Sequence, residues 1–186
     1  ALQVRHREDD ALAQLALHNQ YKLESPRYND PHTKANVLLQ CHFSRREVSR
    51  ELTGDLNEVL DKSTRLIQAM VDVLSSSGWL SPALAAMELC QMCVQGMWDR
   101  DSVLLQLPHF SKDLAKRAGA AGIEGIFELM EMEDDERNGL LQMSATQLAN
   151  VARACNAYPN IELSFEVEDE DEVAAGDSVT VAVSLE

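Results

Sequence analysis

The spacing of apolar residues changes at Pro159, and this change constrains the fold more than any other feature of the sequence. Apolar and polar residues alternate over residues 161–167 and again over residues 179–185. Such alternation predicts two strands, whereas the apolar residues before Tyr158 are spaced three and four apart, as in helices. A lone two-stranded hairpin is marginally stable in water. We therefore expect these strands to begin a larger sheet, in a chain that is part of a longer protein.

Charge is distributed unevenly along the 186 residues, whose formal net charge is −15. Residues 124–186 hold two basic residues against sixteen acidic ones, a net charge of −14. This surface repels phosphate, so a basic protein partner suits it better than nucleic acid, although the acids could also serve only to solvate exposed faces. No apolar run approaches the roughly 20 residues that span a bilayer, so we expect no membrane partner.

Capping residues predict the first helices. Asp30 and Pro31 provide an N-cap acceptor and a proline at the first helical position, which favours a helix to about His42. Ser44 and Glu47 have capping-box spacing and predict a short helix that ends near Gly54. A weaker helix is expected over roughly residues 9–17.

The strongest helical pattern covers residues 56–76. Its apolar stripe consists of Leu56, Val59, Leu60, Ile67, Met70, Val71 and Leu74. Gly78 should end this helix with a positive φ, and Trp79 should bury its ring at the corner before the next helix. Ser81 and Pro82 would cap that next helix, which we expect to run to about Trp98.

Shorter helices are expected after Leu107. Ser111 should cap residues 112–118, residues 123–130 should form the next helix, and residues 133–135 should form a turn. Ser144 and Gln147 have the spacing of a second capping box. The predicted fold is mainly α: a helical bundle over residues 1–107, a helix–loop–helix domain over 108–158, and the first strands of a sheet over 159–186.

Catalytic and metal-binding patterns are missing from the sequence. Cys90 and Cys93 have the spacing of a redox or zinc pair, but they fall within a predicted helix, where buried core thiols are the simpler interpretation. The acidic runs at 131–136 and 166–172 lack the spacing of calcium loops, and no phosphate-binding glycine loop is present. We therefore predict no catalytic residue, no metal site and no cofactor in these residues.

A polar stripe lies on the long helix, opposite its apolar stripe. Lys62, Arg65 and Gln68 lie on this side and are candidates for contact with single-stranded RNA. The alternative is that they form an ordinary solvated face.

Several stretches, including "LNEVLDKSTRLIQAMVDVLSSSGWLSPALAAMELCQMCVQGMW", "FELMEMEDDERNGLL" and "ACNAYPNIELSFEV", resemble the Sec-sixty-three homology module of spliceosomal DExH-box RNA helicases. The resemblance covers nearly the whole chain from about His6. It implies that the two strands open an immunoglobulin-like, fibronectin-type β-sandwich. "LSPALAAMELCQM" and "MEMEDDER" look more like the module of the C-terminal helicase cassette than like that of the N-terminal one.

The resemblance also implies a function. The module would be a non-catalytic part of a nuclear helicase that unwinds U4/U6 RNA during spliceosome activation, with ATP and magnesium bound elsewhere in the parent. It would support the remainder of the helicase chain and dock other spliceosomal proteins. The long helix would correspond to one that contacts the RNA strand, but Asp72 stands where active members tend to have an aromatic residue. The alternatives are an RNA-contacting ratchet element, or the same module of a related helicase, such as that of the activating signal cointegrator complex.

Overall fold

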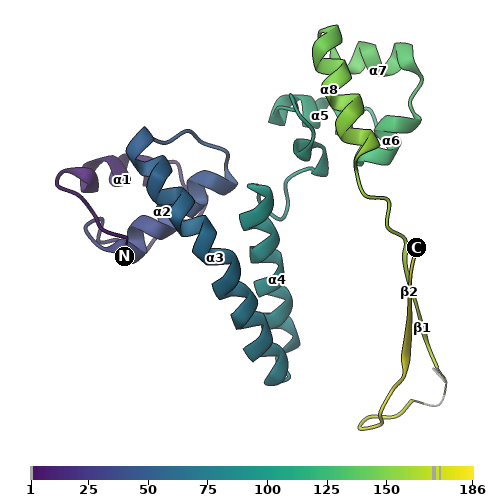
Figure 1. The fold of residues 1–186 in the computed structure, drawn as a ribbon, viewed down its shortest axis with the longest axis horizontal. Helices are drawn as coiled ribbons and strands as arrows, with labels where there is room; N and C mark the ends of the chain where they lie inside the picture. The colour runs from purple at the N-terminus through teal and green to yellow at the C-terminus, as the bar shows by residue number, and fades with distance from the viewer. Residues whose placement is uncertain (1, 169–170, 172) are drawn as a thin grey trace. The chain divides into compact units, whose positions relative to one another are not determined.

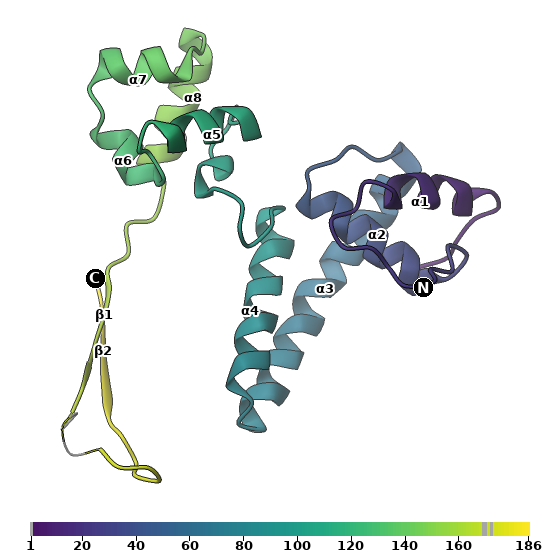
Figure 2. The same ribbon diagram turned by 180° about the vertical axis from the view of Figure 1, so that it is seen from behind.

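The computed structural model describes residues 2–168, 171 and 173–186, and its ribbon is drawn in Figures 1 and 2. The chain forms two compact units, Ala1–Gln106 and Leu107–Glu186. Within the described residues, each unit holds four α-helices, and the second also holds a two-stranded sheet. The expectation of a mainly α fold is therefore confirmed.

The first unit contains α1 (Glu8–Ala16), α2 (Pro31–Phe43), α3 (Arg50–Ser76) and α4 (Leu80–Gln95), followed by the short 3-10 helix η1 (Val103–Gln106). Its first core cluster joins α1, α2 and the start of α3 and consists of Leu12, Val37, Leu38, Cys41, Leu52 and Leu56. The start of α2 agrees with the sequence prediction, since the Asp30 side chain accepts hydrogen bonds from the backbone N–H groups of His32 and Thr33.

The long helix starts earlier than predicted. Ser44 is the C-cap of α2, and the expected capping box with Glu47 does not form. Ser49 is the N-cap instead, and α3 continues through Gly54 without a break. A glycine inside a helix costs about 1 kcal/mol relative to alanine. Burial of Leu52 and Leu56 on either side of Gly54 offsets this cost, because both side chains belong to the core.

The next helix also starts earlier than predicted. Trp79 is the N-cap of α4, so Ser81 and Pro82 occupy its second and third helical positions and do not cap it. Proline is tolerated there because backbone N–H groups in the first turn of a helix have no intrahelical partner. The helix ends at Gln95, before Gly96, which has a φ of 61°.

The second unit contains α5 (Lys112–Ala120), α6 (Ile126–Glu131), α7 (Asp134–Leu141) and α8 (Ala145–Asn156). Two predicted caps are confirmed: Ser111 accepts from the N–H of Leu114, and Ser144 and Gln147 form the full capping box. The turn expected at residues 133–135 is wrong, because Asp134 and Asp135 begin α7. Acidic side chains in a first turn are favourable since they face the positive end of the helix dipole.

The predicted strands are confirmed as β1 (Leu163–Val167) and β2 (Val181–Leu185), which pair antiparallel with Leu163 opposite Leu185 and Val167 opposite Val181. Their apolar side chains are largely exposed: Phe165 is 73% exposed. The predicted β-sandwich remains a prediction, since these two strands form a two-stranded sheet in the described residues. Part of the acidic run at 166–172 lies outside the described residues, namely Asp169, Glu170 and Glu172.

Candidate functional site

The helices α3 and α4 lie side by side in the first unit (Figures 1 and 2). A second core cluster joins them to the end of α2 and consists of Phe43, Ile67, Ala86, Cys93 and Trp98. The buried residues of α4 are small, namely Ala83, Ala86 and Cys93, and the last two belong to this core. Small side chains at a contact allow the axes of two helices to approach closely, so α3 and α4 can pack directly against each other.

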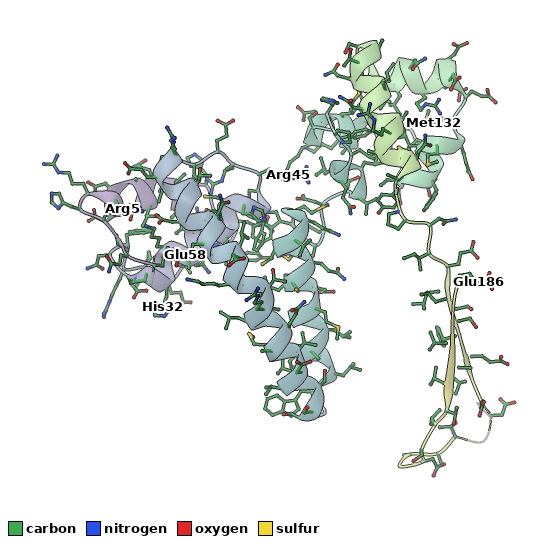
Figure 3. The ribbon with its side chains drawn as sticks, in the orientation of Figure 1. Arg5, His32, Arg45, Glu58, Met132 and Glu186 are labelled. Atoms are coloured by element: carbon green, nitrogen blue, oxygen red, sulfur yellow. The ribbon has the colours of Figure 1, made fainter. Side chains whose placement is uncertain are left out.

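The three RNA-contact candidates all lie on α3 and are exposed to solvent: Lys62, Arg65 and Gln68. Lys62 is paired with Glu58, and its hydrogen bond is the main reason that the pKa of Glu58 is below its usual range. Figure 3 labels Glu58 on α3. In the described part of the chain, Arg65 makes no ion pair.

Acidic residues share this polar side of α3. At 100° per residue, Glu58, Asp61 and Asp72 fall on the same side as Lys62 and Arg65. Three carboxylates therefore accompany two basic groups, which leaves the side with a net charge of −1. Because phosphate binding depends on a positive potential, this side of α3 is a poor surface for gripping RNA.

The backbone at the corner between α3 and α4 confirms the predicted positive φ at Gly78. Gly78 has a φ of 71°. Its N–H donates to the Ser75 carbonyl at 3.0 Å, and the N–H of Trp79 donates to the Leu74 carbonyl at 3.0 Å. These two bonds form a Schellman motif, which satisfies carbonyl groups at the end of the helix.

The prediction that Trp79 buries its ring at this corner is wrong, because the residue is 59% exposed. Alanines take up the inward positions of the first turns of α4, with Ala83 only 4% exposed. Small side chains at these positions let α3 and α4 approach closely. Trp79 contributes its backbone N–H to the corner, and its ring lies at the surface.

Both helices leave apolar side chains uncovered. On α4, Leu80, Leu84, Met87 and Val94 follow helical spacing and are 71%, 50%, 42% and 70% exposed. On α3, the uncovered residues are Leu66, Met70 and Val73. The sequence prediction placed Met70 in the core stripe, which is wrong, since it is 51% exposed. Helical spacing places the four α4 residues on one side of that helix, and we refer to them as the uncovered α4 face.

A buried group of charges lies at the other end of the first unit, and the sequence analysis missed it. Lys34 on α2 is fully buried, and its Nζ lies 2.6 Å from Glu8 Oε2 on α1 and 2.7 Å from Asp55 Oδ2 on α3. Arg5, labelled in Figure 3, lies within 2.7 Å of Glu8 Oε1 and 2.5 Å of Asp55 Oδ2. These four residues form what we call the four-charge cluster.

The electrostatics of the four-charge cluster are those of a structural site. Hydrogen bonds from Arg5 hold the pKa of Asp55 below its usual range despite burial. Burial raises the pKa of Glu8, but hydrogen bonds from Lys34 and Arg5 outweigh it and leave this pKa lowered. The signal in the sequence was the position of Lys34, three and four residues before Val37 and Leu38, on the apolar side of its helix.

The cysteine pair on α4 belongs to the core, as the sequence suggested. Cys93 is 5% exposed and Cys90 packs against the same cluster. Burial, with a smaller contribution from Cys90, raises the pKa of the Cys93 thiol to about 11, so this thiol stays protonated at neutral pH and is a poor nucleophile. Across the described residues, no group of three or more His, Cys, Asp or Glu side chains is arranged to hold a metal.

Among the described residues, none of the helices has both the length and the apolar content needed to cross a bilayer.

Comparison with known proteins identifies the family. The family model of the Sec63 Brl domain matches residues 1–186, and the chain belongs to this family. The chain is 58% identical over 183 residues to the U5 small nuclear ribonucleoprotein 200 kDa helicase of Homo sapiens, covering 98% of this chain and 9% of that protein.

Two further relatives show how far the similarity extends. The DExH-box ATP-dependent RNA helicase DExH12 of Arabidopsis thaliana is 53% identical over 98% of this chain and 9% of its own length. The activating signal cointegrator 1 complex subunit 3-like protein of Dictyostelium discoideum is 46% identical over 100% of this chain and 8% of its own length. The chain therefore spans less than a tenth of the length of these relatives, and the resemblance inferred from the sequence motifs is confirmed.

Proposed function

We propose that the chain is a non-catalytic module of a spliceosomal RNA helicase, which supports the helicase cassette and docks other spliceosomal proteins. The observation that carries this proposal is the composition of α4, where Glu88 is the single charged residue in 16 positions. A helix that is apolar on most sides is normally buried. Here Leu80, Leu84 and Val94 are at least half exposed, which favours a further protein surface as their partner.

The names of the relatives support a wider role in a small nuclear ribonucleoprotein, and the sequence resemblance supplies the rest of the proposed role. The parent would act in the nucleus, in pre-mRNA splicing, where it would unwind U4/U6 RNA and activate the spliceosome. ATP and magnesium would bind in its helicase cassette, outside these residues. The motif "LSPALAAMELCQM" supports a place behind the C-terminal cassette. The U5 small nuclear ribonucleoprotein 200 kDa helicases match this chain at 47–58% identity and the activating signal cointegrator relative at 46%, which favours a splicing helicase as the parent.

A binding experiment between the chain and the separately produced helicase cassette tests this proposal. Introducing charge at two exposed positions of α4, Leu84→Glu with Met87→Glu, should weaken the complex at least about tenfold, because each carboxylate would have to be desolvated at the interface. Gln68→Glu, which adds a carboxylate on the polar side of α3, is the matched control and should bind as the parent chain does. Equal affinity of all three chains would contradict the proposed docking face.

The second candidate function, contact with single-stranded RNA, rests on Arg65, which is exposed and makes no ion pair in the described residues. Titration with labelled single-stranded RNA at two salt concentrations separates the two functions. We expect binding weaker than about micromolar, within the non-specific range. Micromolar or tighter binding that falls steeply with salt, and that Arg65→Ala reduces, would favour the RNA-contacting element instead.

A further inference from the structure

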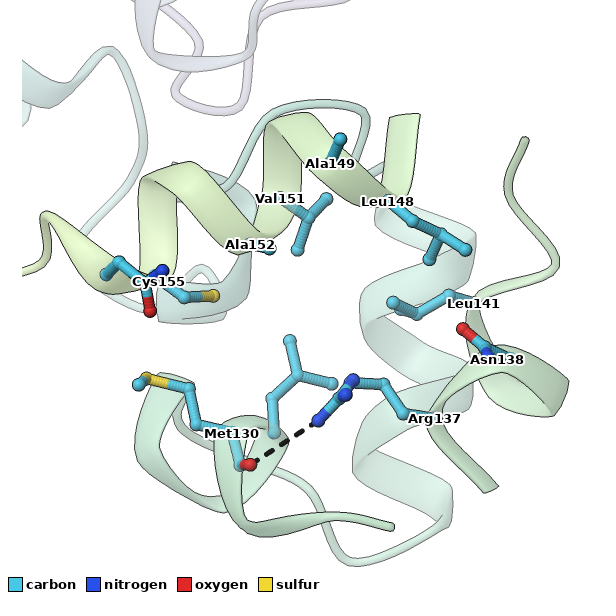
Figure 4. Close-up of a pocket in the computed structure, with 11 residues that line it drawn as sticks. Met130, Arg137, Asn138, Leu141, Leu148, Ala149, Val151, Ala152 and Cys155 are labelled. Atoms are coloured by element: carbon cyan, nitrogen blue, oxygen red, sulfur yellow. Dashed lines mark hydrogen bonds between the residues drawn. The ribbon is translucent and has the colours of Figure 1, made fainter. Parts of the chain in front are cut away.

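A cavity of about 390 Å³ lies among the helices of the second unit. Its volume falls within the range of pockets that hold ligands. Figure 4 shows side chains of α8 on one side and those of α6 and α7 on the other. The floor is apolar and deeply buried: Leu129, Leu141, Val151 and Cys155 are 1–7% exposed. The rim consists partly of exposed residues, among them Asn138, Asn156 and Ala152.

Arg137 is the one charged side chain among the residues that line this cavity. Its Nη1 donates to the Met132 carbonyl at 3.0 Å and to the Met130 carbonyl at 3.4 Å, the second bond being drawn in Figure 4. Its Nη2 is paired with Asp134. Because these partners occupy its guanidinium group, Arg137 links α7 to the end of α6. The same partners make Arg137 a poor binding group for an anionic ligand.

The charge around the cavity selects the kind of ligand. Residues 126–156 carry six acidic residues, all exposed and all on α6, α7 or the loop between them, against Arg137 and Arg153, a net charge of −4. These acids do not line the cavity themselves, but they lie on the elements around it. Their negative potential would repel phosphate and carboxylate ligands and attract lysine and arginine. The floor offers an apolar contact, and the amides of Asn138 and Asn156 are available to hydrogen-bond a peptide backbone.

We propose that this cavity binds a bulky aliphatic side chain of a protein segment in which lysines and arginines flank that side chain. The cavity is independent of the uncovered α4 face, because all residues that line the cavity belong to the second unit. The aliphatic anchor would fill the floor, and the flanking basic groups would pair with the acids of α6 and α7. The buried aliphatic side chain would supply most of the affinity, and the charged pairs would orient the bound segment.

The test is NMR spectroscopy of the whole chain, labelled with carbon-13 in its methionine methyl groups. Met130 lies at the rim and reports on the cavity, while Met70 on α3 is an exposed internal control in the first unit. The probe is a short, end-capped peptide with one leucine between lysines and arginines. We expect the Met130 signal to shift with this peptide and the Met70 signal to stay in place. Replacing the peptide leucine by serine should weaken binding at least about tenfold, because the apolar transfer energy is lost.

Matched variants locate the binding. Ala152→Phe places a large side chain at the rim and should weaken the leucine peptide about tenfold, whereas Ala145→Phe, on the same helix but away from the cavity, should have no effect. A peptide with glutamates in place of its basic residues should not bind. Equal affinity of the leucine and serine peptides, no effect of Ala152→Phe, or a Met130 shift caused by single-stranded RNA would each overturn the proposal.

Discussion

The two tryptophans of the chain differ in what surrounds each indole. Trp98 is 5% exposed, its Nε1 donates to Ser44 Oγ at 3.0 Å, and its ring meets that of Phe43 edge-on with centroids 5.1 Å apart. Trp79 is 59% exposed at the α3–α4 corner. Trp98, the more deeply buried of the two, lies after the end of α4, and the apolar spacing of the helices did not predict its burial.

Replacing each tryptophan by alanine should therefore change the unfolding free energy by very different amounts. Trp98→Ala should cost about 3–5 kcal/mol of unfolding free energy, because it removes a buried ring and leaves a cavity. Trp79→Ala should change the unfolding free energy by less than about 1 kcal/mol, as is usual for surface positions. Urea denaturation followed by circular dichroism measures both values. A large loss for Trp79→Ala would mean that its ring is packed in solution.

The four-charge cluster gives a second prediction at this scale. Lys34→Met should destabilise the chain by about 3–5 kcal/mol, since Glu8 and Asp55 would lose a buried partner. Lys62→Met, the matched control, breaks an exposed pair and should cost about 0.5 kcal/mol or less. Thermal denaturation of both variants compares them directly. Similar melting temperatures for the two would contradict the role of the buried lysine.

The same cluster should make stability depend on pH. The pKa values of Glu8 and Asp55 are lowered in the folded chain, so the unfolded chain binds protons more readily at acidic pH. Their contribution is therefore complete above about pH 4.5 and is lost as the pH falls through the folded pKa values. Glu8→Gln combined with Asp55→Asn should lower stability at pH 7, and its difference from the parent chain should shrink towards pH 3. A difference that stays constant with pH would contradict this account.

At the scale of the element, α3 contains one glycine and ends just before another, and the two have different conformations. Gly54 lies inside the helix and Gly78 has a φ of 71°, and a Cβ at either position would meet nothing within 4 Å. The effect of alanine is therefore set by the backbone alone. Gly54→Ala should stabilise the chain by about 0.5–1 kcal/mol, while Gly78→Ala should destabilise it by about 1 kcal/mol. Opposite shifts of the melting temperature would confirm this, and destabilisation by Gly54→Ala would contradict it.

At the scale of the whole molecule, the hairpin should be the least stable part. The side chains of β1 and β2 are exposed apart from Val167, and the sheet has two strands in the described residues. Exposed backbone hydrogen bonds and few apolar contacts permit local opening. Amide hydrogen exchange should be faster in β1 and β2 than in α2, which carries three fully buried apolar side chains, Val37, Leu38 and Cys41. Equal protection of the hairpin and α2 in a verified monomer would contradict this order.

Features that depend on neighbours within a few residues could be predicted from the amino-acid sequence. Asp30, Ser111 and the pair Ser144–Gln147 cap helices in the structure because a capping side chain reaches only two or three residues along the chain. The alternation in 161–167 and 179–185 likewise predicted β1 and β2, since side chains of a strand point to opposite faces in turn. The family resemblance was also available from contiguous motifs.

Features that depend on residues far apart in the sequence became apparent in the three-dimensional structure. Gly54 stays helical because Leu52 and Leu56 pack on side chains of α1 and α2. Lys34 is buried because α1 and α3 bring Glu8 and Asp55 to its Nζ, a pairing that no local pattern encodes. Trp79 is exposed at the α3–α4 corner, where Ala83 and Ala86 take the buried positions of α4. Burial is a property of the space between elements, and local spacing does not fix which side chains will fill that space.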